Sequence, residues 1–213
     1  MTPAEASVET EKLCRLAPVI PVLVIEDAST ARPLAEALVR GGLPVLEVTL
    51  RTDAALAAIS EMARVEGGVV GAGTLLTPAD MKAAKEAGAL FGVTPGTTDA
   101  LIDAARAESL PLLPGAATAS EAMCLLEKGY TVQKFFPAEP AGGAKYLKSL
   151  SAPLPQIRFC PTGGIGLGNA ADYLSLPNVL CVGGSWIAPP EMLRAGDWDA
   201  IADLAREAAT LAR

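Results

Sequence analysis

The sequence predicts an α/β protein built as a single (β/α)₈ TIM barrel over residues 1–213, with an N-terminal helix ahead of the first strand. Eight short apolar runs recur along the chain at intervals of roughly 20 to 26 residues. A stretch with helical spacing follows each run, and this alternation requires parallel strands joined by crossover helices. Long linkers and low-complexity segments are absent from the sequence, so we expect one domain. A doubly wound open sheet is the alternative.

The predicted strands are the eight apolar runs Val19–Ile25, Val45–Leu50, Val69–Gly73, Leu90–Thr94, Leu110–Leu113, Val132–Phe136, Ile157–Cys160 and Val179–Val182. Helices are predicted at Thr30–Arg40, Asp53–Arg64, Pro78–Ala87, Thr98–Glu108 and Ser120–Lys128. Two of them start with a threonine and an acid three residues later, Thr77 with Asp80 and Thr118 with Glu121, as in a capping box. Gly88 and Gly129 stand where glycine commonly ends a helix.

The composition excludes several classes of protein. The chain contains no histidine, so Ser-His-Asp and Cys-His nucleophiles, H-E-x-x-H zinc sites and an imidazole base are impossible. Its net charge of −7 and scattered lysines disfavour nucleic acid as a partner. Four cysteines without a C-x-x-C pair argue against a structural metal site and suit reduced thiols. A polar N-terminus unlike a signal peptide, and the lack of a membrane-length apolar run, predict a cytoplasmic protein with no membrane partner.

Charged residues in the second predicted strand give the first candidate site. Alternation of side chains along Val45–Arg51 places Glu47, Thr49 and Arg51 on the face that points into the barrel, with the apolar residues between them facing outward. A buried Glu and Arg are costly unless they are paired or used in chemistry. The purely structural interpretation is an internal ion pair, but Glu47 and Arg51 are too far apart along a strand for direct contact without help from neighbours. We therefore favour a functional role for this face.

The sixth predicted strand carries Lys134 between apolar residues, close to the end of the strand. A lysine that extends to solvent at the barrel rim is the structural interpretation. Inside a barrel, however, loss of hydration favours the neutral amine, a nucleophile that forms Schiff bases with ketones. With Glu47 facing the same interior, and with no histidine, Lys134 predicts amine catalysis on a keto substrate.

Glycine pairs follow the last two predicted strands, in Gly163-Gly164 and Gly183-Gly184-Ser185. Loops at these two places form the usual phosphate site of this barrel, because glycine lets backbone N–H groups approach an anion closely. A competing pattern, Gly166–Ala171, fits the loose dinucleotide motif G-x-G-x-x-A. It lies late in the chain and its next strand ends without the required acid, so we interpret this match as accidental.

Six segments carry a resemblance to a known family: Glu47–Thr52, Gly71–Thr74, Pro95-Gly96, Lys134–Glu139, Arg158–Ile165 and Gly183–Trp186. From about Pro18 to the C-terminus, they closely resemble the 2-keto-3-deoxy-6-phosphogluconate (KDPG) aldolases, many of which also act on 2-keto-4-hydroxyglutarate. The resemblance implies a trimeric class I aldolase of the Entner–Doudoroff pathway that needs no cofactor or metal. It would cleave 2-dehydro-3-deoxy-6-phosphogluconate to pyruvate and D-glyceraldehyde 3-phosphate, and 4-hydroxy-2-oxoglutarate to pyruvate and glyoxylate.

Carried over residue by residue, the resemblance makes Lys134 the Schiff-base lysine and Glu47 the acid–base residue. Arg51 and Thr74 would bind the carboxylate end of a phosphorylated keto sugar acid, and Pro95 and Phe136 would shape the pocket. The hydroxyls and the phosphate would be held by Thr162, Gly163, Gly164, Gly184 and Ser185. The chain departs from the family at Gly166-Leu167-Gly168 and at Ala116-Ala117. Both changes flank the site, so they concern substrate range more than the type of reaction.

Two functions of other classes remain open from the residues alone. A catalytically silent barrel could bind a phosphorylated sugar acid, but the presence of both Glu47 and Lys134 disfavours it. A dinucleotide-dependent oxidoreductase is disfavoured by the missing acid.

Overall fold

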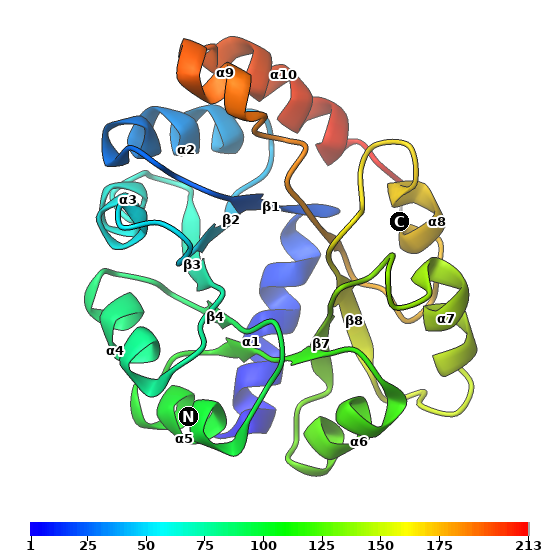
Figure 1. Ribbon diagram of the computed structural model, residues 1–213. Coiled ribbons are helices and arrows are strands. Elements are labelled where there is room, and N and C mark those ends of the chain that lie inside the picture. Colours follow the sequence, from blue (N-terminus) through cyan, green and yellow to red (C-terminus); the bar gives the residue numbers. More distant parts are fainter. Residues whose placement is uncertain (213) are drawn as a thin grey trace.

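The structure, a computed structural model, describes residues 1–212 and has an α/β fold. Parallel strands form a curled sheet at the centre, and helices surround it (Figure 1). The strands are β1 Val19–Leu23, β2 Val45–Thr49, β3 Val69–Gly73, β4 Gly92–Val93, β5 Leu112–Leu113, β6 Gly115–Ala116, β7 Val132–Phe135, β8 Arg158–Pro161 and β9 Val182–Gly184. The helices are α1 Pro3–Leu16, α2 Ala31–Arg40, α3 Ala55–Met62, α4 Pro78–Glu86, α5 Asp99–Ala107, α6 Ala119–Glu127, α7 Gly143–Leu150, α8 Ala170–Leu174, α9 Pro190–Ala195 and α10 Trp198–Ala209, with a 3₁₀ turn η1 at Ala28–Thr30.

The strands pair in two groups, one in the order β5-β4-β3-β2-β1-β9 and the other in the order β6-β7-β8. Pro114 separates β5 from β6, and isolated parallel bridges join Phe159 to Val179 and Thr162 to Gly183 beside β8 and β9. Neighbouring strands are therefore consecutive in the chain, apart from the pairing of the first strand with the last. A doubly wound sheet would instead reverse its order at a switch point.

The predicted elements agree with the observed ones, with the largest difference at the last strand. Each of the five predicted helices ends within two residues of its observed bounds. The capping boxes at Thr77 and Thr118 are confirmed, and a third one, at Thr2, begins the N-terminal helix. The last strand was expected at Val179–Val182 but runs over Val182–Gly184. Its final two residues are glycines, which an apolar pattern does not detect.

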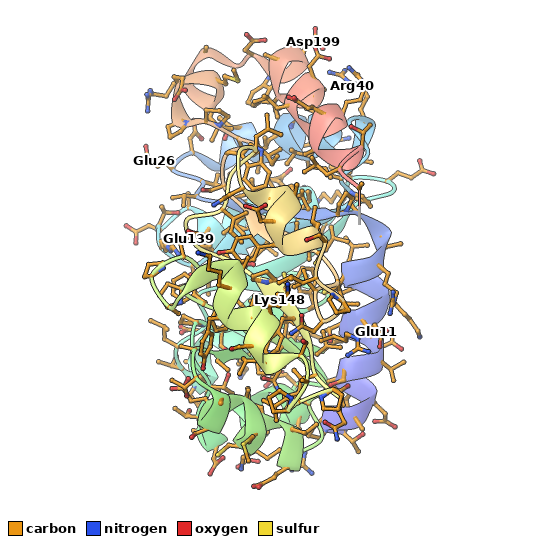
Figure 2. The ribbon with its side chains drawn as sticks, turned by 90° about the vertical axis from the view of Figure 1, so that its right-hand side faces the viewer. Glu11, Glu26, Arg40, Glu139, Lys148 and Asp199 are labelled. Carbon is orange, nitrogen blue, oxygen red and sulfur yellow. The ribbon has the colours of Figure 1, made fainter. Side chains whose placement is uncertain are left out.

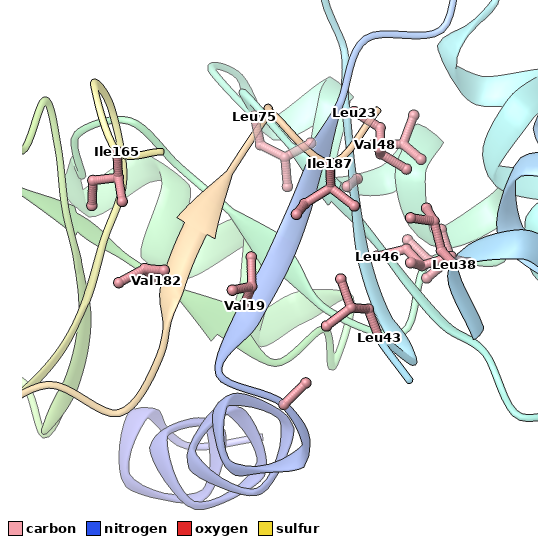
Figure 3. Packing of buried hydrophobic residues seen from close by; sticks show 14 of the residues in the cluster. Val19, Leu23, Leu38, Leu43, Leu46, Val48, Leu75, Ile165, Val182 and Ile187 are labelled. Carbon is pink, nitrogen blue, oxygen red and sulfur yellow. The ribbon is translucent and has the colours of Figure 1, made fainter. Parts of the chain in front are cut away.

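Side chains on the outer face of the strands pack against the helices. Leu46 and Val48 lie in the main apolar cluster and Leu50 packs against it, as the alternation in the second strand predicted. Figure 3 shows Leu46 and Val48 close to Leu38 of α2. Among the described residues 1–212, there is no helix long and apolar enough to cross a membrane.

A second apolar cluster fills the space inside the sheet, near the starts of the strands, and α1 covers it. Cys14 of α1 packs there with Ile20, Val45, Val132 and other interior side chains. In Figure 2, Glu11 of α1 lies on the opposite side of the molecule from Glu26 and Glu139. Because α1 closes the end at which the strands begin, the site must open at their carboxyl ends.

Three of the four cysteines are buried in this interior cluster, whereas Cys124 is exposed on α6. The Sγ atoms of Cys160 and Cys181 lie 3.5 Å apart. Hydrogen bonding to Cys160, together with burial, raises the pKa of the Cys14 thiol, and hydrogen bonds to Cys14 and Cys160, with burial, raise that of Cys181. These two thiols therefore lack both solvent access and thiolate character.

Thiol labelling tests this arrangement. In the native protein we expect one thiol per chain, Cys124, to react rapidly with a disulfide reagent, because Cys14, Cys160 and Cys181 are buried and a reagent cannot reach them. All four should react after unfolding in denaturant. A Cys124→Ser variant should show no rapid native phase. Rapid native labelling of Cys14, Cys160 or Cys181 would contradict the placement of α1 over the interior.

Candidate active site

Lys134 lies on β7 with its side chain inside the curled sheet. The neighbouring Gln133 points the other way, where its Nε2 donates hydrogen bonds to the carbonyl oxygens of Ala122 and Tyr130 at 3.0 and 2.9 Å. Since alternate residues of a strand face opposite sides, the Gln133 contacts to the helix side fix Lys134 on the interior side. The Lys134 side chain is only 6% exposed. The prediction of an interior lysine is therefore correct, and the alternative, a lysine that extends to solvent at the barrel rim, is excluded.

Glu47 on β2 is the partner of Lys134. The Lys134 Nζ and Glu47 Oε1 atoms lie 3.1 Å apart, and the Glu47 side chain is 4% exposed. Thr49, two residues further along β2, donates a hydrogen bond to the carbonyl oxygen of Leu23 at 2.9 Å. The sequence predicted both interior residues, but it left open which cation would meet Glu47. The structure pairs Glu47 with Lys134 rather than with Arg51.

A glycine on the neighbouring strand makes room for the Glu47 carboxylate. A Cβ atom placed at Gly73 of β3 would lie 2.1 Å from Glu47 Oε1, far inside van der Waals contact. No side chain can occupy this position while Glu47 keeps its orientation. The glycine at the end of the third strand is therefore part of the site.

Arg51 differs from its prediction, because β2 ends at Thr49 and Arg51 lies beyond it in an exposed turn. It was expected on the interior face together with Glu47. Its Nε atom instead lies 3.4 Å from Oγ1 of Thr74, at the rim. Thr74 has a φ of 59°, a left-handed conformation that is uncommon for a β-branched residue and that is found chiefly at functional sites.

Phe136 and Thr162 flank the lysine. The Lys134 Nζ atom lies 5.4 Å from the centre of the Phe136 ring, a distance at which a cation is attracted to an aromatic face. The Thr162 side-chain oxygen is buried and has no hydrogen-bond partner among the described residues. A Cβ atom at Gly183 would lie 2.2 Å from that oxygen. Thr162 is thus a buried polar group next to the lysine strand. Pro95 lies farther along the rim, after β4.

Three of the predicted phosphate residues, Gly163, Gly164 and Ser185, lie in the loops that follow β8 and β9, and Gly184 is the buried last residue of β9. Gly163 and Gly164 have φ values of 105° and 77°, so both adopt conformations that favour glycine. Successive backbone N–H groups in such turns can form a concave site for an anion. Ser185 is exposed and lines a cavity of about 460 Å³, together with Val22 of β1. Val22 is the β1 residue in register with Glu47, but neither Glu47 nor Lys134 lines this cavity.

The competing dinucleotide pattern lacks the geometry that it would require. Neither Gly166 nor Gly168 has a positive φ, and a Cβ atom at either position would meet nothing within 4 Å. The Asn169 side chain instead holds this loop. It accepts a hydrogen bond from the backbone N–H of Gly166 at 2.8 Å and donates one to the carbonyl oxygen of Gly164 at 3.1 Å.

Two residues near the glycine loop escaped identification as functional candidates. Glu139 accepts a hydrogen bond from the Tyr173 hydroxyl, and it contacts the loop after β8. Glu139 belongs to the segment Lys134–Glu139, but nothing in the sequence indicates its distant partner, Tyr173. A contact between residues so far apart becomes visible only in the folded chain.

The arrangement as a whole suits amine chemistry. A buried amine in direct contact with a carboxylate can lose its proton to that carboxylate and become a nucleophile. Arg51, the glycine loop and Ser185 then offer separate places for anionic groups around it.

Comparisons with known proteins agree with this chemistry. The family model for KDPG and KHG aldolases matches residues 10–204. The KHG/KDPG aldolase of Escherichia coli K12 is 49% identical over 93% of both chains. The KDPG aldolase structure of Zymomonas mobilis ZM4 with 3-phosphoglycerate is 51% identical, with a TM-score of 0.92 over 97% of this chain and 98% of that one.

A third relative bears on the intermediate. The KDPG aldolase of Legionella pneumophila, with pyruvate captured at low pH as a covalent carbinolamine intermediate, is 45% identical. Its TM-score is 0.91 over 94% of this chain and 98% of that chain. On the strength of the family match and of these identities, this chain belongs to the KDPG and KHG aldolase family.

Proposed function

We propose that the chain is a class I aldolase that cleaves 2-dehydro-3-deoxy-6-phosphogluconate to pyruvate and D-glyceraldehyde 3-phosphate. The observation that carries this proposal is the buried contact of 3.1 Å between Lys134 and Glu47. The names of relatives that are about half identical over most of the chain support the same reaction. The name KHG/KDPG aldolase of the Escherichia coli relative supports 4-hydroxy-2-oxoglutarate, cleaved to pyruvate and glyoxylate, as a second substrate.

The reaction begins at Lys134. Proton transfer from its ammonium group to Glu47 frees the amine, which attacks the C2 ketone and forms a carbinolamine. Glu47 returns this proton to the carbinolamine hydroxyl, which leaves as water; the product is a protonated imine beside a Glu47 carboxylate. The covalent carbinolamine of the Legionella pneumophila relative is an intermediate of this kind. The imine cation accepts the electron pair that is released when the C3–C4 bond breaks.

Glu47 acts as the acid–base group in the remaining steps. It takes the C4 hydroxyl proton, directly or through a water molecule, so that the aldehyde leaves as the C3–C4 bond breaks. It then returns a proton to C3 of the enamine, which gives the pyruvate imine. Hydrolysis releases pyruvate and restores the free amine of Lys134.

The other predicted residues hold the substrate around this pair. We assign Arg51, with Thr74, to the carboxylate end, because a guanidinium fixes a carboxylate in orientation. Phe136 and Pro95 form walls, and we assign the Thr162 side chain, beside the lysine strand, to a substrate hydroxyl. Gly163, Gly164, Gly184 and Ser185 take the phosphate end.

We further propose that the two groups of strands close into a complete (β/α)₈ barrel in one domain over residues 1–213. The pairing of β1 with β9 supports closure, as do the link through Pro114 and the bridges beside β8 and β9. We propose a homotrimer as well, in line with the family resemblance and with the exposed apolar side chains of Leu56, Leu76 and Leu90. A cytoplasmic location and a role in the Entner–Doudoroff pathway complete the proposal.

Trapping of the imine tests the role of Lys134. Borohydride reduction with pyruvate present should attach one reduced pyruvyl group to Lys134, located by peptide mass spectrometry. A Lys134→Met variant should show no adduct and no aldolase activity. The matched variant Lys145→Met, at an exposed lysine on α7, should retain both. An adduct on another residue, or none in the unmodified protein, would refute the mechanism.

Removal of the Glu47 charge tests the acid–base role. Because general acid–base catalysis contributes about 10²–10⁴-fold, Glu47→Gln should lower kcat by at least about 10²-fold. The variant should still form the trapped pyruvate adduct, but more slowly, because water must then take the Lys134 proton in place of Glu47. Glu36→Gln, at an exposed position of α2, serves as the matched control and should retain full turnover. Normal turnover in Glu47→Gln would remove Glu47 from the scheme.

A further inference from the structure

Glu139 lies in the turn that follows the lysine strand, next to the glycine loop at 163–164. In Figure 2 it lies between α7 and α8, on the side of the molecule opposite α1. Its backbone N–H donates to the carbonyl oxygen of Gly163 at 3.0 Å, and the N–H of Ala138 donates to that of Thr162 at 2.8 Å. The hydrogen-bonded ladder of β7 and β8 thus continues beyond the strands into both loops.

The side chain of Glu139 also packs closely on this loop. A Cβ atom at Gly164 would lie 2.7 Å from the Cβ atom of Glu139 and 2.8 Å from its Cγ. Gly164 has a φ of 77°, so both its conformation and its neighbour call for glycine. The position of Glu139 therefore limits where the loop can lie.

Tyr173 of α8 holds the Glu139 carboxylate from the other side. Its side chain is fully buried, and its hydroxyl donates a hydrogen bond to Glu139 Oε1. Burial, followed by the hydrogen bond to Glu139, raises the pKa of Tyr173, so the hydroxyl keeps the proton that it donates. Helix α8 comes directly after the glycine loop in the chain, and Asn169 ties the start of that helix back to Gly164 and Gly166.

We propose that Glu139 and Tyr173 are positioning residues whose hydrogen bond holds the glycine loop in place relative to Lys134, and so determines the affinity for the phosphate end of the substrate. This inference rests on the proposed aldolase function. Lys134 and Glu139 are separated by only four residues, so the bond to Tyr173 joins the lysine strand and the phosphate loop into one unit. A phosphate gains from this loop only if its N–H groups are already oriented.

The test compares ligands with and without phosphate. Loss of this partly buried hydrogen bond to a carboxylate should raise the KM for 2-dehydro-3-deoxy-6-phosphogluconate about tenfold in Tyr173→Phe and in Glu139→Ala. The inhibition constant of inorganic phosphate should weaken by a similar factor. The pyruvate concentration that half-saturates borohydride inactivation should stay within about twofold, because pyruvate does not reach the loop.

Three further variants separate positioning from a general structural effect. Glu139→Gln keeps a hydrogen-bond acceptor for the Tyr173 hydroxyl, so its KM should be close to that of the unmodified enzyme. The double variant Tyr173→Phe with Glu139→Ala should be no worse than either single one, since both remove the same bond. Tyr130 is another buried tyrosine, and its hydroxyl forms no hydrogen bond with the described residues. Tyr130→Phe should therefore leave the KM, the phosphate inhibition constant and pyruvate trapping unchanged.

The measurements distinguish a failure of the positioning role from a failure of the proposed aldolase function. If the unmodified protein neither cleaves the substrate nor traps pyruvate on Lys134, the proposed function fails. If the unmodified protein does both, an unchanged KM in Tyr173→Phe overturns the positioning role. A parallel loss in pyruvate trapping overturns it as well, because that result indicates general damage to the site.

Discussion

The contact between Lys134 and Glu47 places two ionisable groups in the buried interior of the sheet, and much of the surrounding structure makes this contact possible. Removing two charges from water costs several kcal/mol for each ion unless they are closely paired, so neither side chain would be stable there alone. Gly73 leaves the space that the carboxylate occupies. The strands β2 and β7 lie far apart in the chain, so only the curled sheet can bring the two side chains to 3.1 Å.

The need to keep the buried Lys134–Glu47 pair away from water also explains why the two ends of the sheet differ. At the start of the strands, α1 and the interior cluster with its three buried cysteines exclude water from below the pair. At the carboxyl ends, Thr162 and the glycines Gly163 and Gly164 follow β8, and Gly163 lies close to the Phe136 ring. Within residues 1–212, no helix covers this end in the way that α1 covers the other end. A small anionic substrate can therefore reach the amine from one side only. This geometry suits a chemistry that depends on a protected imine.

The sequence allowed much of this site to be predicted, because its signals are local. Alternation along β2 and β7 was enough to place Glu47 and Lys134 inside, and glycine pairs marked the loops after the last strands. Arg51 was misplaced because alternation continues in the sequence after the strand itself has ended at Thr49. The pairing of Glu47 with Lys134, the clearance at Gly73 and the bond between Glu139 and Tyr173 join distant segments. No local pattern contains such information.

Lys134 and Glu47 stabilise each other in the folded protein, and a double-mutant cycle measures this coupling. The free energy of unfolding would be measured for the unmodified chain, Glu47→Gln, Lys134→Met and the double variant. Because removing one partner leaves the other buried and unpaired, we predict a coupling energy of about 1 to 3 kcal/mol between the two sites. If the two single substitutions changed the free energy of unfolding additively, to within about 0.5 kcal/mol, Lys134 and Glu47 would not stabilise each other.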